Sequence, residues 1–166
     1  MTNCETLENN EMEFGKLVQL FEQTQKKMQN QAAKSVDIAL VVRNWLFGLY
    51  IVEFENGAAE RAKLYGKSLI EQLAKRLKTQ GIKGMSPTNL RKCREFYQTY
   101  SKIQQALPVK SFQILFNDSL LKTVSAELSG CFILGWTHYV TLLTLKNAKE
   151  RRFYELEAAE NGWGFE

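Results

Sequence analysis

The stretch that most constrains the fold is residues 36–54, VDIALVVRNWLFGLYIVEF, the most hydrophobic part of the chain. Its Val and Ile content suits a buried strand, but strands usually run about 4–8 residues, so its length favours a buried helix. Asp37 near its start and Asn56-Gly57 just past its end are helix boundary signals. Arg43 and Asn44 interrupt the apolar run, and we expect them to lie at an edge or to be hydrogen-bonded, because unpaired burial is costly. Gly48 is a candidate for a close helix contact.

The remaining periodicity is also helical, and two prolines and ten glycines argue against a turn-rich β fold. We expect an all-α, multi-helix single domain over residues 12–166 and a disordered, acidic segment at 1–11. The expected helices cover residues 12–30, 36–54, 67–78, 87–102, 117–128 and 148–160, with another from about residue 137 after a short extended segment at 131–135. A lead-in helical turn is expected at 58–65 and a connector at 101–112. Asn117 and Asp118 are the predicted caps of the helix that they precede.

Two amphipathic patterns at residues 67–100 flank a turn that contains Gly81 and Gly84, which tolerate positive φ. Ser86 suits the N-cap of the second helix, and Pro87 then takes the first helical position, where its missing N–H costs nothing. The apolar face of the first helix is formed by Leu69, Ile70, Leu73, Ala74 and Leu77. The second helix carries Arg91, Lys92 and Arg94 away from its own apolar stripe.

This basic hairpin has two interpretations. Two helices, a glycine-containing turn and a cationic second helix suggest a helix-turn-helix whose second helix enters a DNA major groove. The alternative is an ordinary helical hairpin with a solvated basic face. The segment from Thr79 to Met85 is longer than the usual 3–4 residues of the motif, which counts against a compact helix-turn-helix.

The net charge of +4 is unevenly distributed along the chain. Residues 59–110 carry 12 Lys and Arg against three Glu, whereas residues 1–58 and 111–166 have net charges of −3 and −2. A dense basic segment between two mildly acidic ones is typical of a localised anion-binding surface, although a solvated helical face also explains it.

No self-sufficient active site is recognisable. The three cysteines, Cys4, Cys93 and Cys131, form no C-x-x-C pair, and with His138 as the only histidine a metal cluster is not expected. His138 between Trp136 and Tyr139 indicates a packed aromatic cluster, since no triad partners accompany it. Asp…Glu-x-Lys, phosphate-loop and dinucleotide-binding motifs are absent from the sequence, so neither an enzyme nor a bound cofactor is predicted.

No segment reaches the roughly 20 apolar residues of a membrane span. The acidic N-terminus, MTNCETLENNEMEF, lacks the features of a signal peptide. We therefore expect a cytoplasmic protein that does not contact membranes.

Four segments together resemble the N-terminal domain of the bacterial YhcG-like family, a domain of unknown function. They are residues 41–77, 83–100, 134–145 and 151–163, with a Gly-x-Ser-x-x-Asn-Leu-Arg helix start, a Trp-x-His-Tyr helix and an Arg-x-Phe-Tyr helix. In that family this domain usually precedes a C-terminal PD-(D/E)XK nuclease domain. Here the sequence stops at Glu166 without the nuclease motif, so nuclease activity is not carried over. Gly135 stands where the family often has Ser before the tryptophan, which puts the local helix cap in doubt.

The resemblance implies binding of double-stranded DNA through the helix at 87–102, with Asn89, Arg91, Lys92 and Arg94 as the matching positions. Phosphate neutralisation would fall to Lys75, Arg76, Lys83, Arg91 and Lys92, and would make affinity strongly salt-dependent. Asn89 and Arg94 are the candidates for base edges, although Arg94 could instead pair with Glu71 or Glu95.

A second hypothesis is a protein-interaction or oligomerisation module that docks or dimerises a nuclease without touching DNA. Here residues 12–35 would be an oligomerisation helix with Phe14 and Phe21 at the seam, and together with residues 36–54 it would pair subunits or dock a nuclease domain. The two hypotheses are compatible, because many helix-turn-helix proteins bind DNA as dimers, and we expect a homodimer.

Overall fold

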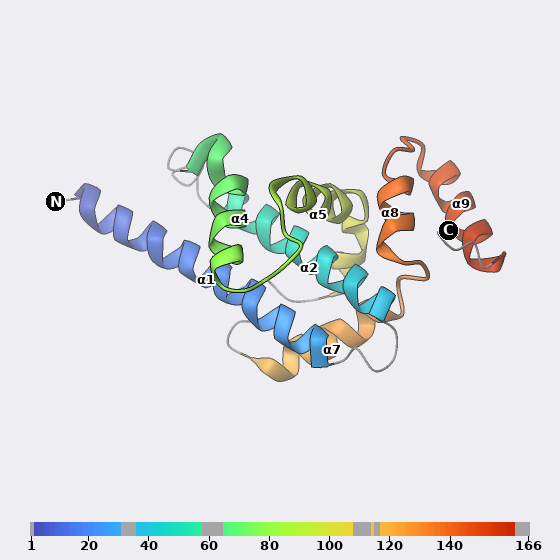
Figure 1. Ribbon diagram of the computed structural model, residues 1–166, viewed down its shortest axis with the longest axis horizontal. Coiled ribbons are helices and arrows are strands. Elements are labelled where there is room, and N and C mark those ends of the chain that lie inside the picture. The colour runs from blue at the N-terminus through green and yellow to red at the C-terminus, as the bar shows by residue number, and fades with distance from the viewer. Residues whose placement is uncertain (1, 31–35, 58–64, 108–113, 115–116, 162–166) are drawn as a thin grey trace.

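The computed structural model describes residues 2–30, 36–57, 65–107, 114 and 117–161, and this part of the chain is helical without a strand (Figure 1). The all-α prediction is confirmed. Residues 58–64 of the predicted lead-in turn and residues 108–112 of the predicted connector lie outside the described residues. The α-helices are α1 (Thr2–Asn30), α2 (Val36–Asn56), α4 (Leu69–Thr79), α5 (Pro87–Thr99), α7 (Asp118–Ser129), α8 (Trp136–Leu142) and α9 (Ala148–Glu160), with 3-10 helices η1 (Gly66–Ser68) and η2 (Ser101–Ala106).

Helix α2 is the centre of the molecule. Every residue from Val41 to Ile51 is buried, and the helix packs against α1, α5, α7 and α8 (Figure 1). A helix that is hydrophobic on all sides is stable in water only when it is covered on all sides. The prediction of a buried helix over this stretch is therefore confirmed.

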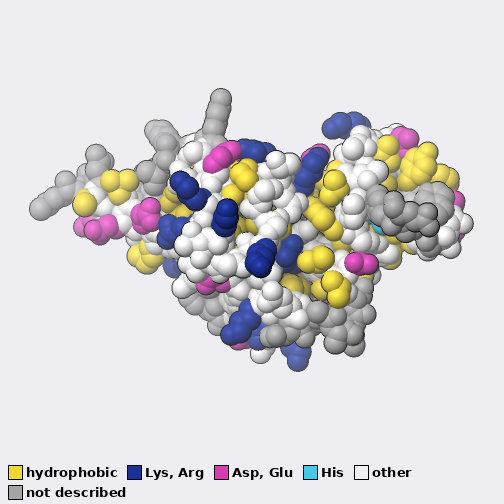
Figure 2. Space-filling model, in the orientation of Figure 1, with side chains coloured by type: hydrophobic (Ala, Val, Ile, Leu, Met, Phe, Trp, Pro, Cys, Tyr) yellow, Lys and Arg dark blue, Asp and Glu magenta, His cyan; other side chains and the backbone are white. Residues whose placement is uncertain are grey.

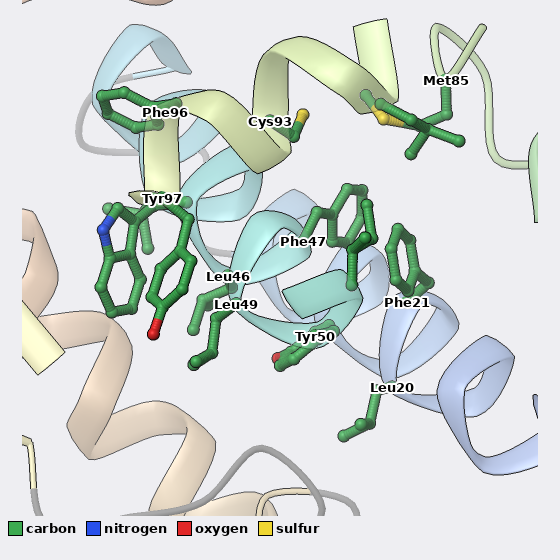
Figure 3. Packing of buried hydrophobic residues seen from close by; sticks show 14 of the residues in the cluster. Leu20, Phe21, Leu46, Phe47, Leu49, Tyr50, Met85, Cys93, Phe96 and Tyr97 are labelled. Carbon is green, nitrogen blue, oxygen red and sulfur yellow. The ribbon is translucent and has the colours of Figure 1, made fainter. Parts of the chain in front are cut away.

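The closest helix contact is between α2 and α5. A Cβ atom on Gly48 would lie 2.2 Å from the carbonyl oxygen of Cys93 and 2.6 Å from the Cβ of Tyr97. Tyr97 of α5 packs edge-on against Trp45 of α2 with ring centroids 5.1 Å apart, and Figure 3 shows Tyr97 between the two helices. Glycine therefore lets the two backbones approach, as the sequence suggested.

Arg43 and Asn44 are hydrogen-bonded, as expected. The Nε of Arg43 donates to Oδ1 of Asn44 at 3.1 Å, and its Nη1 donates to Oε1 of Gln25 on α1 at 3.0 Å. The guanidinium also lies 5.5 Å from the ring centroid of Phe47. These neutral partners hold a largely buried cation between α1 and α2.

Helix α1 differs from the prediction in two ways. It begins at Thr2, so residues 2–11 are helical rather than disordered, and its first turns extend beyond the other helices in Figure 1. Phe14 and Phe21 are buried inside the chain: the Phe21 ring stacks on Phe47 with centroids 4.1 Å apart, and Phe14 stacks on Tyr65 at 4.9 Å. The two residues assigned to a subunit seam thus belong to the core of a single chain.

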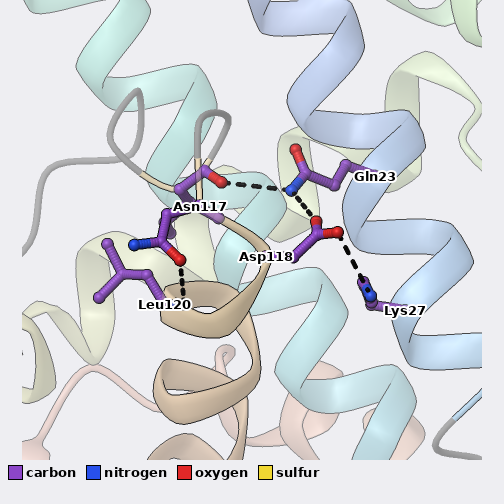
Figure 4. A network of polar contacts seen from close by, with 6 residues as sticks. Gln23, Lys27, Asn117, Asp118 and Leu120 are labelled. Atoms are coloured by element: carbon purple, nitrogen blue, oxygen red, sulfur yellow. Dashed lines mark hydrogen bonds and ion pairs between the residues drawn. The ribbon is translucent and has the colours of Figure 1, made fainter.

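Helix α7 is fixed to α1 at its N-terminus (Figure 4). Asn117 accepts a hydrogen bond from the backbone N–H of Leu120 at 3.1 Å, which confirms it as the N-cap. Asp118 accepts from Nε2 of Gln23 at 2.8 Å and lies 3.6 Å from Nζ of Lys27.

The last two helices are joined through Tyr139. Its hydroxyl accepts from the backbone N–H of Ile133 at 3.1 Å and donates to Oε1 of Glu155 on α9 at 2.9 Å. Burial is the main reason that the pKa of Tyr139 is raised, so the phenol keeps its proton and this bond. Gly135 is the N-cap of α8. Because glycine has no side chain, it makes no capping hydrogen bond, in agreement with the doubt about a cap at this position.

Candidate nucleic-acid interface

An open groove of about 850 Å³ runs along α4 and the turn into α5. The turn is shaped by Gly81 and Gly84, with φ of 81° and 80°, in the left-handed region that favours glycine. The backbone N–H of Ile82 reaches the carbonyl of Leu77 at 3.0 Å, which ends α4 in a Schellman-type cap. This cap buries the Ile82 side chain, which joins Ala74, Met85 and Pro87 in an apolar lining.

Three lysines line the same groove. Lys75 and Lys78 are one helical turn apart on α4, and Lys83 lies in the turn; all three are exposed. Within the described part of the chain, no carboxylate oxygen lies within 4.0 Å of any of these three ammonium groups. On the face drawn in Figure 2, Lys and Arg side chains gather over α4 and the turn. The groove therefore has solvent-exposed lysine ammonium groups around an apolar lining.

The cations of α5, by contrast, are engaged within the chain. Arg91 pairs with Glu71 of α4, and Lys92 lies 3.6 Å from Glu95 on its own helix. Arg94 pairs at 2.9 Å with Glu55 of α2, so neither carboxylate considered for it from the sequence is its partner. Because Glu71 also lines the groove, its pair with Arg91 joins α4 and α5 at the edge of the basic surface.

Two further predicted residues make internal contacts. The amide Nδ2 of Asn89 donates to the carbonyl oxygen of Gly84, and its backbone N–H donates to Oγ of Ser86 at 3.2 Å. Asn89 thus supports the turn and the start of α5. The guanidinium of Arg76 lies 5.3 Å from the ring centroid of Phe14, which turns it toward α1 and away from the groove lining.

Helix α5 begins as predicted, with Ser86 as N-cap and Pro87 in the first turn. It buries Leu90, Cys93, Phe96 and Tyr97, and its outward side presents Thr88, Arg91 and Gln98 to solvent. The seven predicted residues therefore separate into groove lysines (Lys75 and Lys83), residues of α5 (Asn89, Arg91, Lys92 and Arg94) and Arg76 beside α1.

Lys78 lines the groove but was not among the predicted site residues. Its spacing of three from Lys75 was the available signal, because residues i and i+3 share a helix face. The contribution of Ile82 and Met85 to the groove lining was not predictable from helical periodicity, because both residues lie in the turn between α4 and α5. His138, the remaining titratable candidate, is on α8, at the opposite side of Figure 1 from α4.

The described residues contain no group of three or more His, Cys, Asp or Glu side chains arranged to hold a metal ion. None of the helices described is both long enough and apolar enough to cross a membrane.

Comparison with known proteins identifies a family. The family described as the DUF1016 N-terminal domain matches residues 20–166. The chain is 32% identical over 144 residues to the Escherichia coli (strain K12) protein named "Putative nuclease YhcG", covering 80% of this chain and 37% of that protein. No solved structure matches.

Proposed function

Because the chain belongs to the DUF1016 N-terminal domain family, we propose that it is the non-catalytic helical part of a nuclease system and binds duplex DNA through α4, the α4–α5 turn and α5. The name of the Escherichia coli relative supports a nuclease-associated role, and the basic groove supports nucleic acid as the ligand. The aligned region spans 37% of that relative, so chemistry on DNA is assigned to no residue of this chain.

One observation carries the proposal: Lys75, Lys78 and Lys83 are exposed around one groove without a carboxylate partner among the described residues. Ammonium groups of this kind suit phosphate oxygens, because binding releases the counterions condensed on DNA. Arg91 and Lys92 on α5 extend the same surface. Their carboxylate partners are about half exposed, and such surface pairs are weak enough to exchange for phosphate.

Base reading by Asn89 and Arg94 remains a prediction. Asn89 would have to leave the carbonyl of Gly84, and Arg94 would have to leave Glu55. We therefore propose phosphate contacts as the main source of affinity and expect little sequence preference from this chain alone.

Fluorescence anisotropy of a labelled duplex at several salt concentrations tests the proposal. We expect log K to fall linearly with log salt, and replacement of Lys75, Lys78 and Lys83 by Ala should reduce the slope by about 2.7, since each phosphate contact contributes about 0.9. The matched control replaces three exposed lysines away from the groove: Lys26 on α1, Lys122 on α7 and Lys146 between α8 and α9. Equal effects of the two triple variants would contradict a localised interface. Single-stranded RNA and heparin in parallel separate duplex binding from binding of any polyanion.

The second candidate function is a docking module for a nuclease domain. The apolar lining of the groove favours it, because phosphates do not need Ala74, Ile82 or Met85. Two results together would favour docking over DNA contact. The chain would not bind duplex DNA at low salt, and it would bind a separately produced nuclease domain, with this binding lost in the triple lysine variant. The cytoplasmic location remains a prediction.

A further inference from the structure

Helix α9 has an outer face that no described element covers. Its inner side is used within the chain: Glu155 and Ala158 are buried, and Nη1 of Arg151 donates to the carbonyl of Leu145 at 2.7 Å. On the outer side Phe153 is 56% exposed and Leu156 is 41% exposed. Hydrophobic side chains are visible over this end of the molecule in Figure 2.

Four residues follow the outer face at the 4-3-4 spacing of a helix seam. They are Lys149, Phe153, Leu156 and Glu160, and all four are exposed. Arg152 and Glu157 flank them. With 3.6 residues per turn, these six side chains occupy a sector of roughly 140°, opposite the buried Glu155 and Ala158.

Read in opposite directions, two copies of this face place basic residues opposite acidic residues and apolar residues opposite each other. When the helix is laid antiparallel on a copy of itself, with the two-fold axis between Tyr154 and Glu155, Lys149 meets Glu160, Arg152 meets Glu157 and Phe153 meets Leu156. Two-fold symmetry makes each of these pairs occur twice. Parallel pairing would instead place Lys149 on Lys149 and Glu160 on Glu160, which is repulsive.

We infer that α9 is a homodimer interface, in which the helix pairs antiparallel with α9 of a second copy of the chain. Charge complementarity selects the second copy as the occupant, because the basic N-terminal half of α9 faces the acidic C-terminal half of the partner subunit. The apolar pair at the centre supplies the buried surface. This interface is separate from the groove residues, so it holds whether or not the groove binds DNA.

The best residues for testing the antiparallel pairing are those whose charges have no ion-pair partner within the described part of their own chain. Arg152 already lies 3.3 Å from Glu155, and Glu157 accepts a hydrogen bond from Asn161 at 3.3 Å. Lys149 and Glu160 have no ion-pair partner among the described residues. One helix of about 20 Å per subunit makes a small interface, so we expect a reversible dimer at micromolar or higher concentration.

Sedimentation velocity of the 166-residue chain from micromolar to millimolar concentration, at low salt, tests the inference. The wild-type chain is expected to shift from monomer to dimer with concentration. Lys149→Glu and Glu160→Lys each place like charges together twice and should raise Kd by about tenfold or more. An equimolar mixture of the two variants restores both opposite-charge pairs and should form a heterodimer with the wild-type Kd.

Phe153→Ser should abolish the dimer, and Lys122→Glu on α7, an exposed charge change of the same size, should leave it intact. Circular dichroism tests whether each variant is folded. If Phe153→Ser is unstable, the two charge variants, which alter exposed residues, still test whether α9 forms the dimer interface. A chain that stays monomeric up to millimolar concentration would overturn the inference. So would a dimer that is unaffected by Lys149→Glu, or variants that do not recover on mixing.

Discussion

Gly48 shows how one residue sets the distance between two helices. The space for its missing Cβ is occupied by backbone atoms of Cys93, which cannot rotate away as a side chain would. We expect Gly48→Ala to lower the free energy of unfolding by about 3 kcal/mol, because the insertion forces α2 and α5 apart. Urea unfolding followed by circular dichroism measures the change.

Gly15 provides the matched control for Gly48. It also lies inside a helix, but nothing stands within 4 Å of its hypothetical Cβ. Gly15→Ala should therefore stabilise the protein by up to about 1 kcal/mol through helix propensity. Similar effects at the two positions would show that propensity, and not the α2–α5 contact, governs both.

Glu71 is the acidic residue in the lining of the basic groove, and it also holds Arg91. Under the proposed function, Glu71→Gln should tighten duplex binding by about threefold to tenfold, because Arg91 no longer has to leave a carboxylate to reach phosphate and a negative charge is removed from the groove. Stability should fall by less than about 1 kcal/mol, since the pair is exposed. Anisotropy with Glu127→Gln of α7 as the control measures this, and unchanged affinity would contradict a role for Arg91.

At the scale of helices, α1 is part of the core and not an appendage. Phe21 contacts both Phe47 and Tyr50 of α2 and is fully buried. We expect Phe21→Ser to cost at least about 3–5 kcal/mol and to unfold the chain rather than separate folded subunits. Thermal melts with sedimentation distinguish these results, and exposed Met12→Ser should change stability by less than about 0.5 kcal/mol. A folded, fully helical Phe21→Ser monomer would contradict the assignment.

The helices were largely predictable because most combine a periodic apolar pattern with local boundary signals. The bounds expected for α9 are those observed, and α7 differs by one residue at each end. The predicted disorder is wrong for residues 2–11, because a polar, acidic composition suits an exposed helix as well as a disordered segment. Extending an existing helix needs no new nucleation, and acidic Glu5 in the first turn favours the positive helix end. A polar, exposed helix is therefore compatible with residues 2–11.

The site was predictable only in part, because charge is visible in a sequence and pairing is not. Glu55 lies 39 positions from Arg94 along the chain, so only the packing of α5 on α2 brings them together. The contact of Asn89 with Gly84 spans five residues and arises from the turn geometry. Arg76 is on α4 with the groove lysines, but its guanidinium lies over the ring of Phe14 on α1. The sequence alone does not show that α1 packs on this side of α4.

At the scale of the whole molecule, the buried titratable groups predict alkaline sensitivity. Burial raises the pKa of the Cys93 thiol from 9.0 to about 12, and burial with nearby Glu155 raises that of Tyr100 from 10.0 to about 12. Folding thus favours the protonated form of each group. This stabilisation is complete below about pH 9 and is lost as pH rises from 9 to 12.

We therefore expect the urea midpoint to be flat near neutral pH and to fall above pH 9. Urea titrations between pH 7 and 11 check this. Cys93→Ala and Tyr100→Phe remove one titrating group each, so each variant should show a shallower alkaline decline than the wild-type chain. A midpoint independent of pH up to 11 would show that neither group is coupled to folding.

The enclosure of α2 also has a consequence during synthesis on the ribosome. Helix α2 ends at Asn56, but α5, against which it packs most closely, begins at Pro87. At about 5–20 residues per second, α2, the most apolar of the described helices, is synthesised several seconds before that cover, and among the described elements only α1 precedes it. We therefore expect the nascent chain to pass through an aggregation-prone stage, which codons that slow translation between these two helices would lengthen.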